Sequence, residues 1–241
     1  MSSGPTPERF SVNDGKERAL TIADRLREIY GVPEVHRLDP LDELILTILS
    51  QNTNDVNRDR AWRSLRARFS TWEEVLDAPT EVVEESIRVG GLSEVKAARI
   101  QAALRRIRDE CGRLSLDHLG GMTLDEARSY LLSFDGVGPK TAATVLLFSL
   151  GRPAFPVDTH VHRVSGRLGL IDAGTTAECA HEILAGLFPP ERYMEVHINL
   201  IHLGRDLCAA RRPRCRDCPL LDLCPHGLDR TGDNTGEGSR V

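Results

Sequence analysis

Two residues that could do chemistry together, Lys140 and Asp158, lie in the stretch LLSFDGVGPKTAATVLLFSLGRPAFPVDTH, residues 131–160. A neutral lysine amine is a nucleophile suited to Schiff-base chemistry. A carboxylate beside such an amine can stabilise a developing cation and carry a proton. A simpler interpretation is open for each residue: Lys140 as a solvated lysine that contacts phosphate, and Asp158 as the N-cap of a helix that begins at Thr159.

The turn before Lys140 has the composition of an anion site. Gly136 and Gly138 permit positive φ and the close approach of another backbone, and Pro139 suits the first turn of the following helix. This turn, with Val137 between the glycines, would present backbone amides at a helix N-terminus, where phosphate binds. An ordinary corner between two helices is the alternative. Because a cation is disfavoured at the positive end of a helix, the same position favours the free amine of Lys140.

Four cysteines near the C-terminus form a second chemical cluster, with the spacing C-x6-C-x2-C-x5-C. Four thiolates can enclose a structural zinc ion or hold a [4Fe–4S] cluster, and local disulfides are a further alternative. Between the first two cysteines lies AARRPR, so ligation would hold Arg211 and Arg212 in a loop that can contact phosphates. Cys111 and Cys179 stand apart and are expected to be ordinary buried thiols. The four clustered cysteines are Cys208, Cys215, Cys218 and Cys224.

Helical periodicity dominates the elements that must position these residues. No stretch shows sustained alternation of apolar and polar residues, so the sequence predicts an all-α fold. Helices are expected at about 16–30, 40–49, 54–69, 72–78, 80–89, 93–110, 124–133, 176–187 and 190–206. The expected N-caps include Asp39, Thr71, Thr80 and Ser93, and TLDE at 123–126 and TTAE at 175–178 have the pattern of capping boxes.

Composition narrows the class of protein. The N-terminal segment has no apolar signal region and no apolar run suits a membrane span, so we expect a cytoplasmic protein with no membrane contact. The net charge of -5 does not favour a nucleic-acid partner. Residues 205–216, however, carry five arginines against one aspartate, so a local basic surface is compatible with an acidic chain. The polar ends, 1–15 and 227–241, are expected to be disordered.

The motifs GVGPKTA and FPVDTHVHRV, followed by the cysteine spacing, resemble the endonuclease III branch of the helix-hairpin-helix DNA glycosylases over roughly residues 16–226. The resemblance implies two helical lobes flanking a DNA-binding cleft. One lobe would be a six-helix barrel over 33–152, with the helix-hairpin-helix at about 124–150. The other would be an iron–sulfur domain built from 16–32 and 153–226. The resemblance also implies a [4Fe–4S] cluster rather than zinc, and damaged double-stranded DNA as the partner. We expect a monomer, because recognition of one lesion requires only one copy of the chain.

The resemblance further implies a bifunctional DNA glycosylase and AP lyase of base excision repair. A damaged nucleotide is flipped out of the duplex, the amine of Lys140 attacks C1′, Asp158 assists departure of the base, and β-elimination nicks the strand. Oxidised pyrimidines of the thymine glycol type are the expected substrates. Three alternatives stay open: a glycosylase for mismatched thymine or uracil, a non-catalytic helix-hairpin-helix DNA-binding protein, and a zinc-ribbon protein.

Two further positions bear on the flipped-out nucleotide. The family's gap-filling glutamine corresponds to Asn52, with Gln51 directly before it, which is a departure from the family pattern. The family's wedge leucine corresponds to Leu92, for which packing into the core at a helix entry is the alternative. The hairpin also departs in its SFDG entry and in Pro139, where a basic residue is common. These departures are expected to alter affinity or lesion range rather than the type of reaction.

Overall fold

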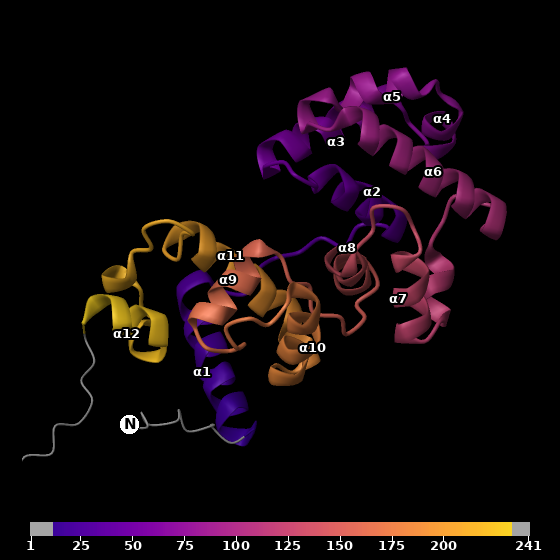
Figure 1. Cartoon of the computed structure of the whole chain (residues 1–241). Helices are drawn as coiled ribbons and strands as arrows, with labels where there is room; N and C mark the ends of the chain where they lie inside the picture. Colours follow the sequence, from indigo (N-terminus) through magenta and orange to yellow (C-terminus); the bar gives the residue numbers. More distant parts are fainter. Residues whose placement is uncertain (1–11, 233–241) are drawn as a thin grey trace, which may run out of the picture. The chain divides into compact units, whose positions relative to one another are not determined.

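The computed structural model describes residues 12–232, and within that range the chain forms helices and connecting turns with no strand. The all-α prediction is therefore confirmed. The chain divides into two compact units (Figure 1). Unit 1 comprises Met1–Glu34 and Val157–Val241, and unit 2 comprises Val35–Pro156. Among the residues described, none of the helices combines the length and the apolar character that crossing a membrane requires.

Unit 2 is built around one apolar core in which α2 is the central element. Seven of the eleven residues of α2 are buried, and this helix packs against α3, α6 and α8. Removal of this apolar surface from water is the main stabilising contribution to the unit. The helices of unit 2 are α2 (Pro40–Ser50), α3 (Asp55–Arg68), α4 (Trp72–Asp77), α5 (Thr80–Ile87), α6 (Ser93–Cys111), α7 (Leu124–Leu132) and α8 (Pro139–Thr144), with the 3-10 turns η1 (Arg88–Gly90) and η2 (Asp117–Gly121) and the π-helical turn η3 (Val145–Ser149).

Several helix starts follow the predicted capping chemistry. The Asp39 side chain accepts hydrogen bonds from the first backbone amides of α2, and Pro40 occupies the first turn, as predicted. Thr71 and Thr123 each form a complete capping box, with Glu74 and Glu126 respectively. The caps predicted at Asp39, Thr71 and Thr123 are therefore confirmed. Such caps can be predicted from the sequence because they depend only on residues within one helical turn.

Three other predicted caps are wrong, although the helices α5, α6 and α10 begin at or next to their predicted positions. Thr80 lies inside α5 after Pro79, and its hydroxyl donates to Oε1 of the buried Gln101 at 2.6 Å instead of capping the helix. A buried amide needs hydrogen-bond partners, and here Thr80 supplies one. Helix α6 is preceded by Leu92 in a left-handed conformation, so Ser93 is its first residue rather than its cap.

The cap of α10 is shifted by one position from the prediction. Thr176, not Thr175, accepts a hydrogen bond from the backbone amide of Cys179. The third helical position is then a cysteine, so the reciprocal bond that Glu178 would make in a capping box is absent there.

Unit 1 joins the N-terminal helix to helices from the last third of the sequence. In Figure 1 the indigo helix α1 lies beside the orange helices, and α1 packs against α10 and α11. Glu195 of α11 is buried and accepts hydrogen bonds from Arg27 of α1 and from Arg192. The elements of unit 1 are α1 (Val12–Tyr30), α9 (Thr159–Arg167), α10 (Ala177–Leu187), α11 (Tyr193–Asp206) and α12 (Pro225–Thr231), with the 3-10 turns η4 (Pro190–Arg192), η5 (Cys215–Asp217) and η6 (Leu221–Leu223).

Helical structure extends into both segments that were expected to be disordered. Helix α1 already begins at Val12, and α12 covers residues assigned to the C-terminal tail. The Cys224 side chain caps α12, Pro225 opens it, and Gly232 ends it with a φ of 73°. The sequence prediction missed α12 because the helix is short and carries little apolar periodicity. Residues 1–11 and 233–241 of the two predicted ends lie outside the described range.

Candidate functional site

The glycine turn predicted as an anion site connects α7 to α8. Gly136 has a φ of +74°, and a Cβ built there would lie 2.6 Å from Nε of Arg99. Gly138 is the N-cap of α8 in an extended conformation, so only one of the two glycines uses a positive φ. The side chain of Val137 is 7% exposed and belongs to the core of unit 2, which leaves only its backbone for a ligand.

The start of α8 is open to an approaching ligand. No side chain caps the helix at Gly138, and a Cβ placed on this glycine would meet nothing within 4 Å. Pro139 occupies the first turn, as predicted, where its missing N–H leaves no donor unsatisfied. This arrangement presents backbone amides beside open space, as phosphate binding at a helix N-terminus requires.

Lys140 follows in the first turn of α8 and is half-buried. The whole chain contains only three lysines. Lys16 is exposed on α1 in unit 1, and Lys96 is buried inside unit 2. Lys140 is thus the one lysine that stands next to the glycine turn, which makes a nucleophilic role unusually simple to test.

A carboxyl group that the sequence prediction missed acts on Lys140 electrostatically. Glu43 lies on α2, which packs against α8. Burial raises the pKa of the Glu43 carboxyl, opposed by a hydrogen bond from the Thr47 hydroxyl at 3.3 Å and by the charges of Lys140 and Arg58. A glutamate amid the apolar positions of α2 was the available signal for this residue.

Gln51 and Asn52 have different surroundings although they are adjacent. Gln51 is half-buried, and its Nε2 donates to the carbonyl of Gly136 at 2.8 Å. Nη1 of Arg99 donates to Oε1 of the same glutamine at 3.4 Å. Asn52 is exposed and has a φ of 51°. Gln51 therefore connects the end of α2 to the glycine turn, and Asn52 points its side chain to solvent.

Leu92 is 55% exposed, so its side chain does not pack into the core. Its φ of 50° is left-handed, a conformation that costs a branched residue about 1 kcal/mol or more. Three described residues other than glycine have a positive φ: Asn52, Leu92 and Arg212. Each of the three is predicted from the sequence to contact DNA, and unusual backbone conformations concentrate at functional sites.

Asp158 caps α9 in unit 1, as predicted. Its Oδ1 accepts a hydrogen bond from the amide of Val161 at 2.7 Å. In the described part of the chain Oδ2 accepts none, and the residue is half-buried. The capping bond holds the carboxylate in one orientation and leaves its second oxygen for another partner.

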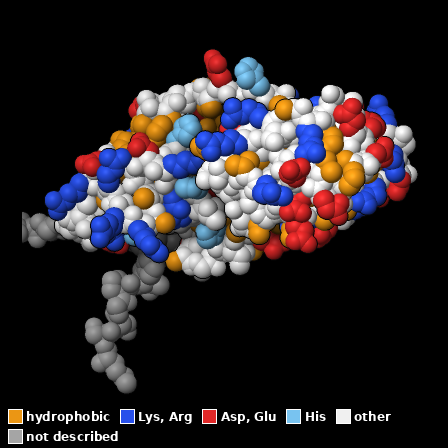
Figure 2. All heavy atoms as spheres, turned by 90° about the horizontal axis from the view of Figure 1, so that it is seen from above, with side chains coloured by type: hydrophobic (Ala, Val, Ile, Leu, Met, Phe, Trp, Pro, Cys, Tyr) orange, Lys and Arg blue, Asp and Glu red, His pale blue; other side chains and the backbone are white. Residues whose placement is uncertain are grey.

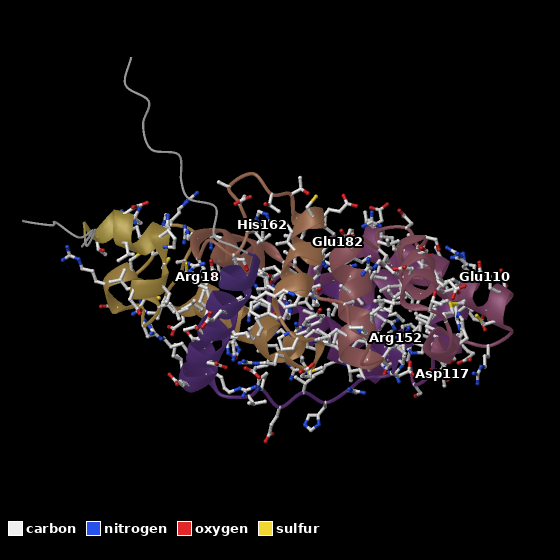
Figure 3. All side chains as sticks on the ribbon, turned by 90° about the horizontal axis from the view of Figure 1, so that it is seen from below. Arg18, Glu110, Asp117, Arg152, His162 and Glu182 are labelled. Atoms are coloured by element: carbon white, nitrogen blue, oxygen red, sulfur yellow. The ribbon has the colours of Figure 1, made fainter. Side chains whose placement is uncertain are left out.

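Arginines of α9 connect this helix to the cysteine loop. Nε of Arg163 donates to the carbonyl of Cys208 at 3.2 Å. Arg167 donates to the carbonyl of Ala209 at 2.8 Å and to Sγ of Cys208 at 3.3 Å. Figure 3 labels Arg18 on α1, whose guanidinium donates to the carbonyl of Leu223 at 2.6 Å between the last two cysteines. The loop is therefore held from two helices of unit 1.

All four clustered cysteines line a single pocket in unit 1, together with Leu207, Pro213 and Leu221. None of the six cysteines forms a disulfide. Burial raises the pKa of the Cys218 and Cys224 thiols, and the other cysteines of the pocket raise it further. Charge of opposite sign is therefore needed before these sulfurs ionise together.

The four cysteine sulfurs that line the pocket are a donor set that fits a [4Fe–4S] cluster. No three His, Cys, Asp or Glu side chains in the described range converge on one metal position. A [4Fe–4S] cluster binds each thiolate through a different iron, so its ligands stand farther apart than the ligands of a zinc ion.

Away from this pocket, Cys111 is half-buried and Cys179 is exposed on α10, so the prediction that both are buried is wrong.

The loop between Cys208 and Cys215 exposes Arg211 and Arg212. Nη2 of Arg167 donates to the carbonyl of Ala210 at 3.0 Å, which fixes the loop where the arginines begin. On the face drawn in Figure 2, blue Lys and Arg side chains spread over the part of the view that holds unit 1, although the chain as a whole has a net charge of -5. The loop thus presents a local basic surface of the kind predicted from the sequence.

Comparison with known proteins identifies the family. Residues 45–190 match the HhH-GPD superfamily of base excision DNA repair proteins. A protein of Arabidopsis thaliana named as a DNA glycosylase is 37% identical over 75% of this chain, which spans 65% of that relative. Endonuclease III of Thermotoga maritima is 35% identical over 84% of this chain and 92% of the relative. A solved structure of a non-covalent endonuclease III–DNA complex superposes with a TM-score of 0.78 at 30% identity, over 90% of this chain and 98% of that one.

The chain therefore belongs to the HhH-GPD superfamily of base excision DNA repair proteins and is an endonuclease III-like DNA glycosylase. The resemblance inferred from the motifs GVGPKTA and FPVDTHVHRV is confirmed, as is the prediction of an enzyme of the glycosylase and AP lyase class.

Proposed function

We propose that the protein removes oxidised pyrimidines of the thymine glycol type from damaged double-stranded DNA and cleaves the strand at the resulting site. The observation that carries the proposal is the position of Lys140, in the first turn of α8 directly after the open glycine turn. Relatives named endonuclease III support strand cleavage, and a neighbour solved in complex with DNA supports the choice of partner. The protein acts in the cytoplasm. It acts as a monomer, because recognition of one lesion requires only one copy of the chain.

In the proposed reaction, the Lys140 amine attacks C1′ of the flipped nucleotide. The bond from C1′ to the base breaks, and the base leaves with the electron pair and takes up a proton. The carboxylate of Asp158, oriented by its bond to the Val161 amide, stabilises the positive charge that develops on the sugar. The C1′–O4′ bond of the sugar then opens, O4′ takes up a proton, and the nitrogen forms the C1′=N bond of the Schiff base. Loss of a proton from C2′ of this Schiff base breaks the C3′–O bond and expels the 3′ phosphate, which nicks the strand.

The proposed DNA contacts divide into phosphate contacts and duplex insertion. Backbone groups of Gly136, Val137 and Gly138 and the start of α8 bind a phosphate, and Arg211 and Arg212 bind others. Asn52, rather than Gln51, fills the gap left by the flipped nucleotide, because the Gln51 amide already donates to Gly136. Leu92 wedges between bases from its exposed left-handed position.

We infer that Cys208, Cys215, Cys218 and Cys224 hold a [4Fe–4S] cluster. When bound, the cluster supplies iron–thiolate bonds that cross-link the loop. The chain itself contributes the arginines of α9 and Arg18, which fix the carbonyls of that loop. In this arrangement the four cysteines keep Arg211 and Arg212 exposed towards DNA phosphates.

Borohydride trapping tests the nucleophile. Reduction of the Schiff base joins the protein covalently to DNA, so wild type is expected to form an adduct with a thymine glycol duplex. Lys140→Ala is expected to lower the adduct yield by at least about a hundredfold, because no other described lysine adjoins the turn. The matched control is Lys16→Ala, which removes an exposed lysine of α1 and is expected to trap within about twofold of wild type.

Equal trapping by Lys140→Ala and wild type would show that another group is the nucleophile. Duplexes with uracil or thymine mismatches are measured in parallel with thymine glycol. Preference for a mismatch would reject oxidised pyrimidines as the substrate class. Binding to all duplexes without any adduct or nick would favour the non-catalytic alternative.

The cluster is tested by the iron and acid-labile sulfide content of protein purified without oxygen. We expect brown protein with both constituents. Cys218→Ala is expected to lose them, because the thiolate is one of four ligands. Cys179→Ala, which removes an exposed thiol of α10, is the control and is expected to keep them. Colourless protein that contains zinc and no sulfide would reject the cluster.

A further inference from the structure

Lys96 has an ammonium group buried inside unit 2 without an ion-pair partner in the described chain. The residue is 1% exposed, and its Nζ donates to the carbonyls of Leu49 and Gly90, each at 2.8 Å. Burial lowers the pKa of this amine. A buried charge without a carboxylate is unfavourable for stability, so its presence calls for a role beyond filling space.

The two carbonyls belong to the ends of two different segments. Leu49 lies in the last turn of α2, immediately before the Gln51–Asn52 segment. Gly90 ends η1, two positions before Leu92. Carbonyls at the C-terminal end of a helix lack intrahelical donors, and a cation is favourable there. One ammonium group therefore satisfies the ends of both segments at once.

Both segments contain a residue in a left-handed conformation that the surroundings must hold in place. Asn52 and Leu92 have φ values of 51° and 50°. Lys96 lies one helical turn after Leu92, and its own amide donates to the Leu92 carbonyl at 3.0 Å. On the other side, a Cβ on Gly90 would lie 3.1 Å from Cβ of Ala61, so the η1 end is closely packed against α3. Lys96 thus bonds to the Gly90 carbonyl, which is close to it in sequence, and to the Leu49 carbonyl, which belongs to a distant helix.

We propose that Lys96 is a positioning residue that fixes the spacing between Asn52 and Leu92, and so determines how efficiently a nucleotide is flipped from the duplex. The inference rests on the proposed function, in which these two side chains enter the DNA. Lys96 touches neither the DNA nor the reacting sugar, because its side chain is enclosed. Loss of its donors would leave two buried carbonyls unpaired and would uncouple the two segments.

The test compares a reaction that needs nucleotide flipping with one that does not. Single-turnover rates are measured for base excision from a thymine glycol duplex and for strand cleavage at an abasic site in single-stranded DNA. Lys96→Met keeps a similar aliphatic length and removes the donors. We expect excision to fall by about tenfold or more, the scale of one lost charge-assisted hydrogen bond, and single-strand cleavage to stay within about twofold. Melting temperatures report whether Lys96→Met is folded. If Lys96→Met does not fold, Lys96→Gln is measured in the same way.

A second comparison separates this inference from the function on which it rests. Leu92→Ala and Asn52→Ala are measured in wild type and in Lys96→Met. In wild type, each substitution is expected to lower the rate of excision from the duplex. In Lys96→Met, the same substitution is expected to cause a smaller fold-decrease, and this non-additivity shows that the residues are coupled. Two results would overturn the proposed role of Lys96 and leave the proposed function standing. One is an equal fold-decrease in rate on both substrates for Lys96→Met, and the other is additive effects of Lys96→Met with Leu92→Ala and Asn52→Ala. If Leu92→Ala and Asn52→Ala leave excision unchanged in wild type, the proposed insertion contacts are wrong and the Lys96 inference is overturned with them.

Discussion

The glycine turn of unit 2 is held in place through its backbone by two side chains from other elements. Gln51 donates to the carbonyl of Gly136, and Arg99 occupies the space where a Gly136 side chain would lie. Arg99 also donates to Gln51, so the three residues form one contact network. The turn that precedes Lys140 is therefore supported by α2 and α6 as well as by its own sequence.

Substitution of the two glycines by alanine is expected to separate stability from DNA binding: Gly136→Ala should reduce stability, and Gly138→Ala should reduce DNA affinity. Gly136→Ala forces a side chain into a left-handed position and displaces Arg99, so it should lower the free energy of unfolding by about 1–2 kcal/mol. Gly138→Ala has an extended backbone and open space, so its effect should stay within about 0.5 kcal/mol. Because the new methyl group would meet the incoming phosphate, Gly138→Ala should instead weaken DNA binding.

Urea denaturation and equilibrium binding to a thymine glycol duplex check this pair of expectations. Equal loss of stability in the two variants would contradict the different backbone states of the glycines. Unchanged DNA affinity in Gly138→Ala would remove this turn from the phosphate contacts.

At the level of single residues, local motifs were sufficient to predict where the candidate site residues lie in the fold. Lys140, Asp158 and the four clustered cysteines occupy the expected turns and loop. Lys96 and Glu43 were not singled out from the sequence, because burial and neighbours far away in sequence distinguish them, and local patterns encode neither. The left-handed state of Leu92 was missed for the same reason, since a leucine has no local preference for it.

Several helices of this protein begin where local capping chemistry predicts, and one expected capping group is engaged instead by a tertiary contact. Asp39, Thr71 and Asp158 cap the helices for which they were predicted. Thr80 does not, because its hydroxyl bonds to the distant Gln101. Helix positions follow from apolar periodicity, whereas such exceptions and the short helix α12 depend on contacts that are formed only in the folded chain.

The link between α1 and α11 is expected to make unit 1 sensitive to acid. Burial raises the pKa of the Glu195 carboxyl, but hydrogen bonds from Arg27 and Arg192 lower it more, so the net shift is downward. A carboxyl whose pKa is lower in the folded state stabilises above its unfolded pKa and loses this contribution as the pH falls through the folded pKa. Glu195→Gln should therefore reduce stability by about 1–2 kcal/mol at neutral pH, because the buried Glu195 loses its charge-assisted hydrogen bonds, whereas the exposed Arg27 stays hydrated.

The difference in unfolding free energy between wild type and Glu195→Gln should shrink as the pH falls below the usual range of a glutamate. Urea denaturation across this acidic range provides the measurement. Glu85→Gln is the matched control, since Glu85 pairs with Arg68 at the solvent-exposed surface, where an ion pair contributes little, and its substitution should leave stability almost unchanged. A stability difference for Glu195→Gln that does not change with pH would contradict the assigned ion pair.

At the level of the whole molecule, composition and periodicity were sufficient for the all-α class but not for the partners of each helix. Nothing in the sequence of α1 indicates that it packs with α10 and α11, because amphipathic helices of similar length are interchangeable by pattern alone. The family resemblance supplied that information, through motifs whose order matches known relatives. Physical patterns predicted the elements, and the resemblance predicted their assembly.

The discontinuity of unit 1 has a consequence for synthesis on the ribosome. Helix α1 is made first, yet its packing partners α10 and α11 follow only after all of unit 2 has been made. Unit 2 can therefore bury its core while the chain is still growing, whereas α1 keeps its apolar face uncovered until late in translation. During that interval the nascent chain exposes a helix that chaperones can recognise, and the order of folding is the reverse of the order in which the two units begin.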